Sequence, residues 1–347
     1  MSLDRDKIWA FIDRVGELTS GTALLGVLAV ADRSGLLASW EPDTWVTPQD
    51  LARGQFSERY VREILYALAS ARIVEHDEGR FLLPAEHAAV LVDATSPYLM
   101  AGWLDLLPAV MKSVDAVAAV TVHGGGVPAA AFDDRVVAGI DRSNSPSIRI
   151  LLTRRWLAAL PDLVAKLERG GRIADIGCGS GAAAATMARA YPQATVIGFD
   201  VDPRAIERAR LEATTSDLPN LSFEQLPAEQ IPDGFDLVTA FDVIHDLPNP
   251  QATLLRVREA LNPAGTFFMM EPNAGPELSD NMHPYGSLLY GISVLYCLPQ
   301  SLVGNGPGLG TAWGPVEAEK YCREAGFTFF RRLNIDSPFS AFYEVRP

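Results

Sequence analysis

The residues best placed to do chemistry lie in one short stretch, 172–181, which reads RIADIGCGSG. The apolar run before the glycines predicts a buried parallel strand, and residues 182–190 predict a helix. Gly177, Gly179 and Gly181 let the backbone turn sharply between them and let a ligand approach the main chain. The start of the helix offers unpaired N–H groups and the positive end of the helix dipole. The stretch therefore predicts a binding site for a nucleotide-like cofactor.

Two cofactor classes fit this turn. With Ala182 as the third small residue, the spacing satisfies the dinucleotide fingerprint. Asp175, however, stands two residues before the first glycine, where it would repel a pyrophosphate and attract a cationic group. Asp200 ends the next predicted strand, 194–199, and its carboxylate can accept two hydrogen bonds from ribose hydroxyls. The two acids favour a cationic, ribose-containing cofactor.

This pattern resembles the class I methyltransferases that use S-adenosylmethionine (SAM). In that family the first acid faces the amino-acid end of SAM and the second binds the ribose. The resemblance implies these cofactor contacts: Asp175, Gly177, Cys178, Gly179, Gly181, Asp200, Val201, Ala228, Glu229, Phe241 and Asp242.

One position departs from the family pattern. An Asp is usual after the third strand, where it meets the adenine amino group, but this chain has Pro227 there. Glu229, Gln230 or a backbone carbonyl must then take that contact.

From residue 171 onward, the pattern predicts a doubly wound α/β sheet. Strands are expected at 172–176, 194–199, 221–225, 235–240, 265–270, 327–334 and 340–345, and helices at 182–190, 203–215, 250–261 and 315–325. The last two strands are joined by a short turn, so they must pair antiparallel. The SAM methyltransferase sheet has such an antiparallel last strand and the dinucleotide fold lacks it.

The N-terminal residues predict a winged-helix domain. Helices are expected at 5–38 and 57–71, and a further helix should begin at Pro48 with Thr47 as its N-cap. A hairpin is expected at 73–83. Residues 1–96 hold nine Lys and Arg against fifteen Asp and Glu, a net charge of −6, which argues against DNA binding. The module resembles the N-terminal dimerisation domain of small-molecule O-methyltransferases of plant and bacterial natural-product pathways. A homodimer is the partner that this resemblance implies.

Whole-chain properties narrow the function further. The net charge is −14, which argues against nucleic-acid and anionic-membrane partners. Three widely separated cysteines show no metal-binding spacing and favour a reduced, cytoplasmic protein. No metal is expected. Three regions are expected: a winged-helix domain at 1–96, a helical connector roofing the active site at 97–170, and a SAM-binding domain at 171–347 with a lid insertion at 275–314.

His245 is the candidate general base. It follows the fourth strand of the predicted sheet, whose carboxyl edge should hold the cofactor. Neutral imidazole can accept a hydroxyl proton near pH 7. Glu271 closes the next strand, where its carboxylate could fix the imidazole tautomer, and Asp246 follows His245 directly. The three residues resemble the catalytic His and flanking acids of plant-type O-methyltransferases.

Residues 281–316 contain no Asp, Glu, Lys or Arg. A solvated loop of this length would carry charge, so we expect a helix at 287–298 over the active site, with a dimer contact as the alternative. The composition predicts a largely apolar acceptor, aromatic or polycyclic. The candidate pocket residues are Trp103, Trp156, His283, Tyr290 and Tyr296.

These observations predict a SAM-dependent methyltransferase that acts on a small apolar acceptor, with O-methylation and a His base expected. C- or N-methylation on the same scaffold is the first alternative. A SAM-binding transcription regulator and an NAD-linked oxidoreductase are the others.

Overall fold

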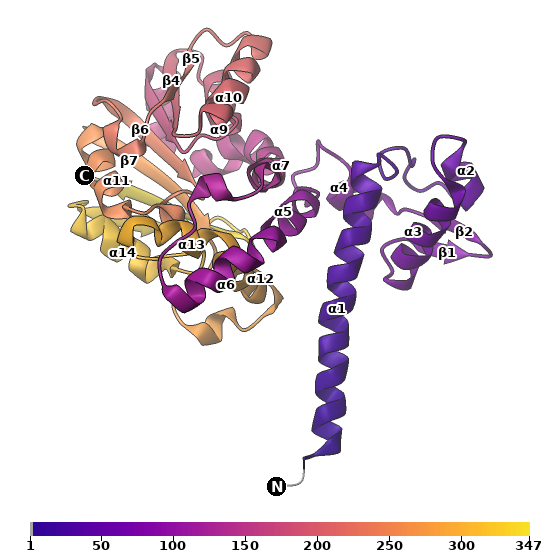
Figure 1. Cartoon of the computed structure of the whole chain (residues 1–347). Helices are drawn as coiled ribbons and strands as arrows, with labels where there is room; N and C mark the ends of the chain where they lie inside the picture. The colour runs from indigo at the N-terminus through magenta and orange to yellow at the C-terminus, as the bar shows by residue number, and fades with distance from the viewer. Residues whose placement is uncertain (1–2) are drawn as a thin grey trace. The chain divides into compact units, whose positions relative to one another are not determined.

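The computed structural model describes residues 3–347 (Figure 1). The chain forms two compact units, Met1–Pro108 with Ala138–Pro146, and Ala109–Val137 with Ser147–Pro347. The expected connector, residues 97–170, therefore contributes to both units.

The first unit is a winged-helix domain with an extended first helix. Its elements are α1 (Arg5–Arg33), α2 (Pro48–Ala52), α3 (Glu58–Ser70), the antiparallel hairpin β1 (Glu75–Asp77) and β2 (Arg80–Leu82), α4 (Ala85–Leu91) and the first part of α5 (Trp103–Val110). Thr47 caps α2 as expected, in a reciprocal capping box with Asp50. Ser57 stands at the N-cap of α3, but its side chain makes no capping hydrogen bond. Helix α1 ends five residues earlier than expected, because Gly35 at φ +80° turns the chain out of the helix.

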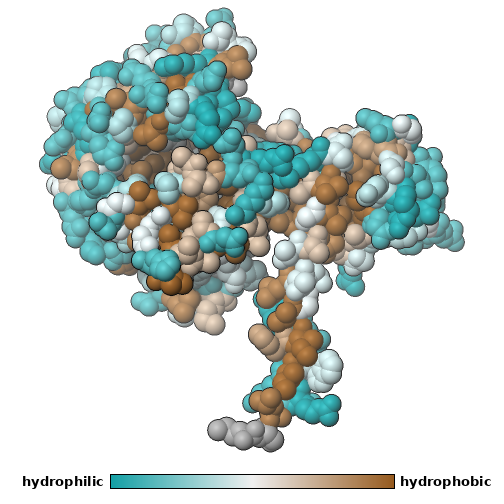
Figure 2. Space-filling model, viewed as in Figure 1, coloured by the Kyte–Doolittle hydropathy of each residue, from teal (hydrophilic) through white to brown (hydrophobic). Residues whose placement is uncertain are grey.

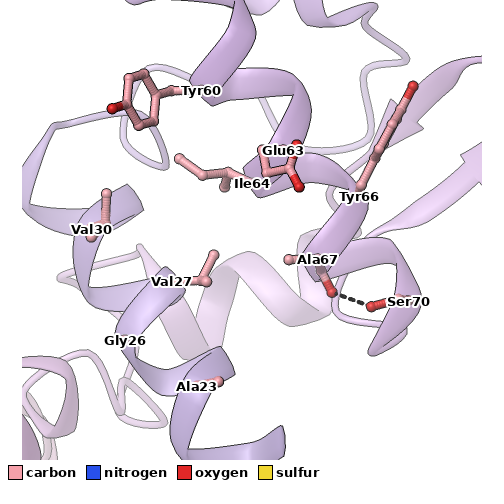
Figure 3. A pocket seen from close by; sticks show the side chains of 10 residues that line it. All are labelled: Ala23, Gly26, Val27, Val30, Tyr60, Glu63, Ile64, Tyr66, Ala67 and Ser70. Atoms are coloured by element: carbon pink, nitrogen blue, oxygen red, sulfur yellow. Dashed lines mark hydrogen bonds between the residues drawn. The ribbon is translucent and has the colours of Figure 1, made fainter.

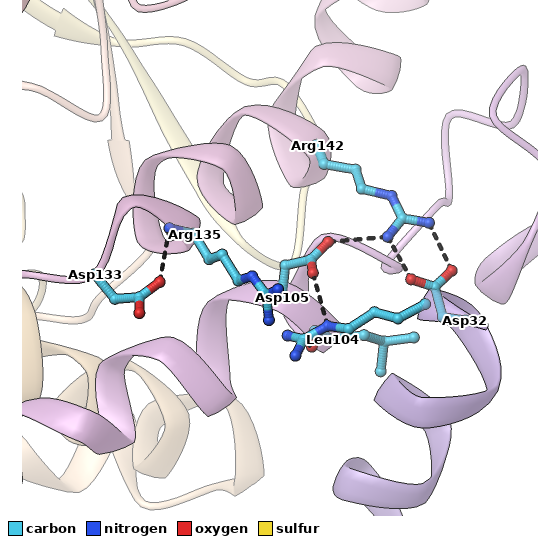
Figure 4. Close-up of polar contacts among 7 residues, drawn as sticks. Asp32, Leu104, Asp105, Asp133, Arg135 and Arg142 are labelled. Carbon is cyan, nitrogen blue, oxygen red and sulfur yellow. Dashed lines mark hydrogen bonds and ion pairs between the residues drawn. The ribbon is translucent and has the colours of Figure 1, made fainter. Parts of the chain in front are cut away.

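The C-terminal part of α1 is anchored and the rest is exposed. Arg142 donates to both carboxylate oxygens of Asp32, at 2.6 and 2.8 Å, and to Asp105 at 3.0 Å (Figure 4). Large apolar side chains along the earlier turns are exposed to solvent, as the brown surface of this helix shows (Figure 2). They are Ile8, Trp9, Phe11, Ile12, Val15 and Leu18.

A groove of about 720 Å³ runs between α1 and α3 within this unit (Figure 3). Small residues of α1, among them Ala23 and Gly26, form one wall, and Tyr60, Ile64 and Ala67 of α3 form the other. The unit thus presents an unfilled apolar groove as well as an exposed apolar helix.

The second unit contains a seven-stranded sheet in the order β5-β4-β3-β6-β7-β9-β8. The strands are β3 (Gly171–Ile176), β4 (Ala194–Asp200), β5 (Leu221–Gln225), β6 (Phe235–Phe241), β7 (Leu261–Pro272), β8 (Phe329–Arg332) and β9 (Ser340–Arg346). β3 to β7 pair in parallel, whereas β9 pairs antiparallel with both β7 and β8. The expected doubly wound sheet with an antiparallel last strand is confirmed.

Helices cover both faces of this sheet. α9 (Ala182–Ala190) and α10 (Pro203–Ser216) pack in one core, and α11 (Pro250–Ala260) and α14 (Gly314–Glu324) in the other. Earlier in the chain come α6 (Val114–His123), α7 (Asp134–Leu151), whose middle belongs to the first unit, and α8 (Pro161–Glu168). Side chains alternate along each strand between two cores, so that Phe267 faces one core and Phe268 the other.

The uncharged segment is a run of helical turns. α12 (Pro284–Ile292), the π-helical turn η8 (Ser293–Cys297) and α13 (Leu298–Ser301) follow one another directly. The helix begins three residues before its expected start, because Pro284 suits a first helical position and His283 accepts a capping bond from Gly286. In the glycine-rich part that follows, the N–H of Gly310 donates to the carbonyl of His245 at 3.2 Å.

Two helical stretches, Arg5–Arg33 and Trp103–His123, are long and apolar enough to cross a membrane by length and composition alone. The core helix of a soluble protein can meet the same criteria.

Candidate cofactor and active site

Two features favour glycine in the turn between β3 and α9. The backbone is left-handed at all three positions, and neighbouring side chains leave no room for a Cβ atom at two of them. Gly177, Gly179 and Gly181 have φ angles of +62°, +54° and +87°, the left-handed region. A Cβ atom would lie 2.6 Å from Val243 at Gly177 and 2.5 Å from Phe223 at Gly181. At Gly179 it would meet no atom within 4 Å. The middle glycine therefore borders open space that a ligand can occupy.

Asp200 ties this turn to the end of β4. Its Oδ2 accepts from the N–H of Gly179 and its Oδ1 from the N–H of Asp202, both at 2.9 Å. Burial raises the pKa of Asp200. The carboxylate is thus held at the carboxyl edge of the sheet, next to the open space at Gly179.

Asp175 lies beneath the turn at the end of β3 and is 1% exposed. Its Oδ1 accepts from the hydroxyl of Thr239 at 2.7 Å. Burial raises the pKa of Asp175 to about 7, although the Thr239 bond favours the ionised form. A cationic ligand group nearby would reverse this rise.

A cavity of about 530 Å³ opens beside the turn. Gly179, Asp200 and Val201 line one side, and Phe132 and Tyr296 also line it. The structure therefore brings together three of the expected cofactor contacts and one expected pocket residue.

The wall formed by residues 129–137 was not predicted from the sequence. The N–H of Val127 donates to the carbonyl of Pro299 at 2.9 Å, which attaches this segment to α13. Asp133 caps α7, and Lys112 pairs with Asp133. No local pattern in the sequence indicated that this segment lines the cavity.

The remaining expected cofactor contacts do not line this cavity. Ala228 and Glu229 form the 3₁₀ turn η5 (Ala228–Gln230), and Glu229 accepts from Thr253 at 3.0 Å. Cys178 is 8% exposed, and burial raises the pKa of its thiol. Phe241 packs against Phe268.

Asp242, directly after β6, has a φ angle of +55°. Such a conformation is uncommon for a residue other than glycine, although Asp adopts it more readily than most.

His245 and Glu271 form a buried pair. His245 lies in the short turn η6 (Ile244–Asp246) after β6, and Glu271 lies near the end of β7. Nδ1 of His245 is 2.5 Å from Oε2 of Glu271, whose Oε1 accepts from the N–H of Ile244 at 2.9 Å. The two side chains are 3% and 1% exposed. Glu271 therefore holds the imidazole in one orientation.

The other ring nitrogen faces a second acid. Nε2 of His245 lies 3.1 Å from Oδ1 of Asp246. Burial favours the neutral imidazole, but the charges of Asp246 and Glu271 outweigh it and hold the pKa of His245 well above its usual range. The charged form of the imidazole is thereby favoured, so a role as base requires that Nε2 first lose its proton.

Cys297, at the end of η8, joins this group. Its thiol lies within hydrogen-bond reach of His245 and Asp246, and burial raises its pKa. No motif in the sequence indicated this residue, because 51 residues separate it from Asp246 and only the tertiary fold brings them together.

The other expected pocket residues are dispersed. Trp156 is buried in the core against Phe342. His283 caps α12, and the hydroxyl of Tyr290 accepts from Asn281 at 3.3 Å. Trp103 belongs to the other compact unit.

Two family matches cover most of the chain between them. Residues 167–313 match the methyltransferase domain family, and residues 22–93 match the Rv2258c-like winged HTH domain. Among curated proteins, the ubiquinone biosynthesis O-methyltransferase of Albidiferax ferrireducens is 31% identical over 112 residues, which is 31% of this chain and 44% of that protein. That of Xanthomonas campestris is 37% identical over 111 residues, which is 31% of this chain and 45% of that protein. The chain thus spans less than half the length of these relatives.

Solved structures resemble the whole chain. Human N-acetylserotonin methyltransferase, solved in complex with SAM, has a TM-score of 0.67 at 18% identity and covers 100% of this chain and 99% of its own. CalO1, a methyltransferase in calicheamicin biosynthesis, has a TM-score of 0.67 at 19% identity and covers 100% of both chains. At these identities the likeness establishes the fold. The chain therefore combines a region similar to the Rv2258c-like winged HTH domain with a region similar to the methyltransferase domain family.

Proposed function

We propose that this protein transfers the methyl group of SAM to an oxygen atom of a small, largely apolar acceptor. The observation that carries the proposal is the buried His245–Glu271 pair, at the same carboxyl edge of the sheet as the glycine turn and Asp200. A neutral amine can attack the methyl group through its lone pair without first losing a proton, whereas a hydroxyl group is activated by a base, so the pair favours oxygen over nitrogen.

The residues present fit SAM as the cofactor. The cavity beside Gly179 is about 530 Å³, and a Cβ at that glycine would enter open space. Asp200 would hold the ribose and Asp175 would balance the amino group. When bound, SAM supplies a sulfonium methyl group that is already activated.

The work left to the protein is to position the acceptor, exclude water and take one proton. His245 would accept the hydroxyl proton at Nε2 once that nitrogen has lost its own proton. Glu271 would keep Nδ1 protonated and stabilise the imidazolium that forms.

The acceptor class follows from the surroundings of the cavity. Phe132 and Tyr296 line it, and their rings meet edge to face with centroids 4.9 Å apart. Tyr296 comes from the segment without any charged residue. An aromatic or polycyclic hydroxyl compound suits these rings, and the carboxylates of Asp133 and Asp134, which also line the cavity, disfavour a phosphorylated one. No metal ion is required for the transfer itself.

We propose in addition that the protein is a cytoplasmic homodimer joined through its winged-helix unit. The exposed apolar face of α1 and the groove beside it support this association. The negative charge of residues 1–96 weighs against a role in DNA binding.

The proposal is tested first by calorimetry with SAM, S-adenosylhomocysteine and NAD. Binding of the first two and not of NAD is expected, and the reverse result would exclude a methyltransferase. A gel-shift assay with DNA tests the regulator alternative and is expected to be negative. A turnover screen over phenolic natural products then identifies acceptors.

The base is tested by His245→Gln, with His283→Gln as the matched control, because His283 is an exposed capping residue. Loss of general-base catalysis is expected to lower kcat by about 10²–10⁴-fold in the first variant and to leave the second near wild type. A wild-type rate for His245→Gln between about pH 6 and pH 9 would show that His245 is not the base.

A further inference from the structure

Three potential metal ligands meet where the sequence shows no metal motif. They are His245 and Asp246 of η6 and Cys297 of η8, and one ligand atom from each lies within 4.8 Å of the other two. Imidazole nitrogen, carboxylate oxygen and thiolate sulfur are the donor types that Zn²⁺ takes in proteins. We propose that this cluster is a binding site for a thiophilic divalent cation, best matched by Zn²⁺.

The spacing of the cluster suits a tetrahedral ion. Two ligand atoms that are each about 2.0–2.1 Å from a tetrahedral Zn²⁺ lie roughly 3.4 Å from each other. Nε2 of His245 and Oδ1 of Asp246 are 3.1 Å apart, so two ligands are nearly in place. Only the Cys297 side chain must move closer, by on the order of 1 Å.

The outer contacts also match a metal site. Glu271 accepts from Nδ1 of His245, the carboxylate–histidine arrangement that commonly supports a metal-bound imidazole. Once Nε2 has lost its proton, its lone pair faces the other two ligands. Oδ1 of Asp246 is buried and accepts no well-aligned hydrogen bond from the described residues. A cation would satisfy this oxygen.

The donor set selects the ion. Mg²⁺ and Ca²⁺ need several oxygen ligands, and the cluster offers one carboxylate. Zn²⁺ binding replaces the S–H bond of Cys297 and the N–H bond at Nε2 of His245 with bonds to zinc, and both protons leave to the solvent. A fourth position stays open for water.

One consequence rests on the proposed function. A bound ion occupies the Nε2 lone pair, so His245 cannot act as a base while zinc is present, and zinc inhibits methyl transfer. The binding itself does not depend on that function.

The test uses the full chain, freed of metals with a chelator and then titrated with Co²⁺ alone or Zn²⁺ alone. We expect one ion per chain, a sulfur-to-cobalt charge-transfer absorption band that Zn²⁺ abolishes, and proton release by calorimetry in two buffers. A wild-type protein without the band would overturn the proposal, whatever its methyltransferase activity.

Variants locate the ion. Cys297→Ser should abolish the band, and Glu271→Gln should weaken Zn²⁺ binding by about 10–100-fold. Cys322→Ser is the matched control, because Cys322 is also a buried free thiol and lies in α14; it should leave the band intact. Circular dichroism verifies that each variant is folded. A band that survives in Cys297→Ser places the ion elsewhere and overturns the assignment.

Discussion

At the scale of single residues, the cofactor site depends on buried acids whose charge is costly without a ligand. Asp175 is almost fully buried, and in the free protein no cation lies among the groups that determine its pKa. Its raised pKa means that the free protein favours the neutral acid, whereas the amino group of SAM would favour the carboxylate. Cofactor binding and protonation of Asp175 should therefore oppose each other.

The extent to which SAM stabilises the protein should therefore depend on pH. The pKa of Asp175 is about 7 in the folded protein and about 3.9 when unfolded, so the folded state holds an extra proton between these values. The free energy of unfolding of the free protein should fall as pH rises from about 4 to about 7, by on the order of 4 kcal/mol from this group. The increase in Tm that saturating SAM produces should consequently be larger at about pH 8 than at about pH 6.

Calorimetric melting with and without SAM measures this effect. Asp175→Asn should keep the Thr239 hydrogen bond and lose the pH dependence, while Asp13→Asn on the exposed part of α1 should keep it. An unchanged dependence in Asp175→Asn would mean that another group is responsible.

A substitution at Gly179 has two separate effects: it lowers the stability of the protein through backbone strain, and it lowers the affinity for a ligand in the cavity. Gly179→Ala places an alanine at φ +54°, which costs roughly 1–2 kcal/mol of stability, but its Cβ meets no protein atom within 4 Å. We expect a folded protein with a similar loss of stability and at least a tenfold weaker affinity for SAM, because the methyl group enters the cofactor cavity.

Gly35→Ala provides the matched control. Gly35 also has a positive φ, +80°, and open space at its Cβ, but it lies in the winged-helix unit. It should lose similar stability and keep its affinity for SAM in calorimetry. Equal affinities for the two variants would contradict the placement of SAM at Gly179.

At the scale of elements, the cavity is enclosed by segments that are distant in sequence. Residues 129–137 and the π turn η8 contribute Phe132 and Tyr296, whereas β3 and β4 contribute the turn and Asp200. A π-helical turn often marks a functional position, and here it contains Tyr296 and Cys297. The predicted uncharged lid thus reaches the site through these two side chains.

Removing one ring tests this enclosure. Phe132→Ala deletes an edge-to-face pair worth about 0.5–1.5 kcal/mol beyond buried area from the proposed acceptor wall, so the KM for the acceptor should rise several-fold. Phe339→Ala is the matched control, because Phe339 and Tyr285 form a pair of the same geometry, 4.9 Å and 79°, that does not line the cavity. Steady-state kinetics should show a changed KM only in the first variant; the same KM in both would remove Phe132 from the site.

At the scale of the whole molecule, α1 is the feature that a single chain leaves unexplained. Several large apolar side chains along its first half are exposed, and only 11% of its apolar window is buried. Contiguous exposed apolar surface of this kind usually marks an interface with protein or membrane. A second copy suits it, because the groove between α1 and α3 is apolar and lined by small residues.

The association is expected to depend on α1. Ile12 is 48% exposed, and an aspartate there would place a charge in the proposed interface. Light scattering should give twice the chain mass of 37.5 kDa for the wild type and a single chain for Ile12→Asp. Val122→Asp, at a 77% exposed position of α6, is the matched control and should stay dimeric.

A monomeric wild type would contradict the homodimer. If the wild type instead binds lipid vesicles and Ile12→Asp does not, α1 is a membrane element.

The sequence alone determined the cofactor domain, because its signals are local. Strand and helix periods, the three glycines and the short last turn each depend on neighbouring residues, and the strands expected at 194–199 and 221–225 appear within one residue of their bounds. Parallel strands present their carboxyl ends on one edge of the sheet, so the sequence alone predicts that Gly179 and Asp200 lie together at that edge.

Only the tertiary structure decided what surrounds that edge. Phe132, Tyr296 and Cys297 reach it through packing between segments far apart in the chain, and no local pattern encodes such contacts. Both Trp156 and His283 were expected in the substrate pocket. Packing instead buries Trp156 in the core and leaves His283 as the exposed N-cap of α12. Burial likewise set the charges of the site, because the pKa values of Asp175 and His245 depend on groups that meet only in the folded chain.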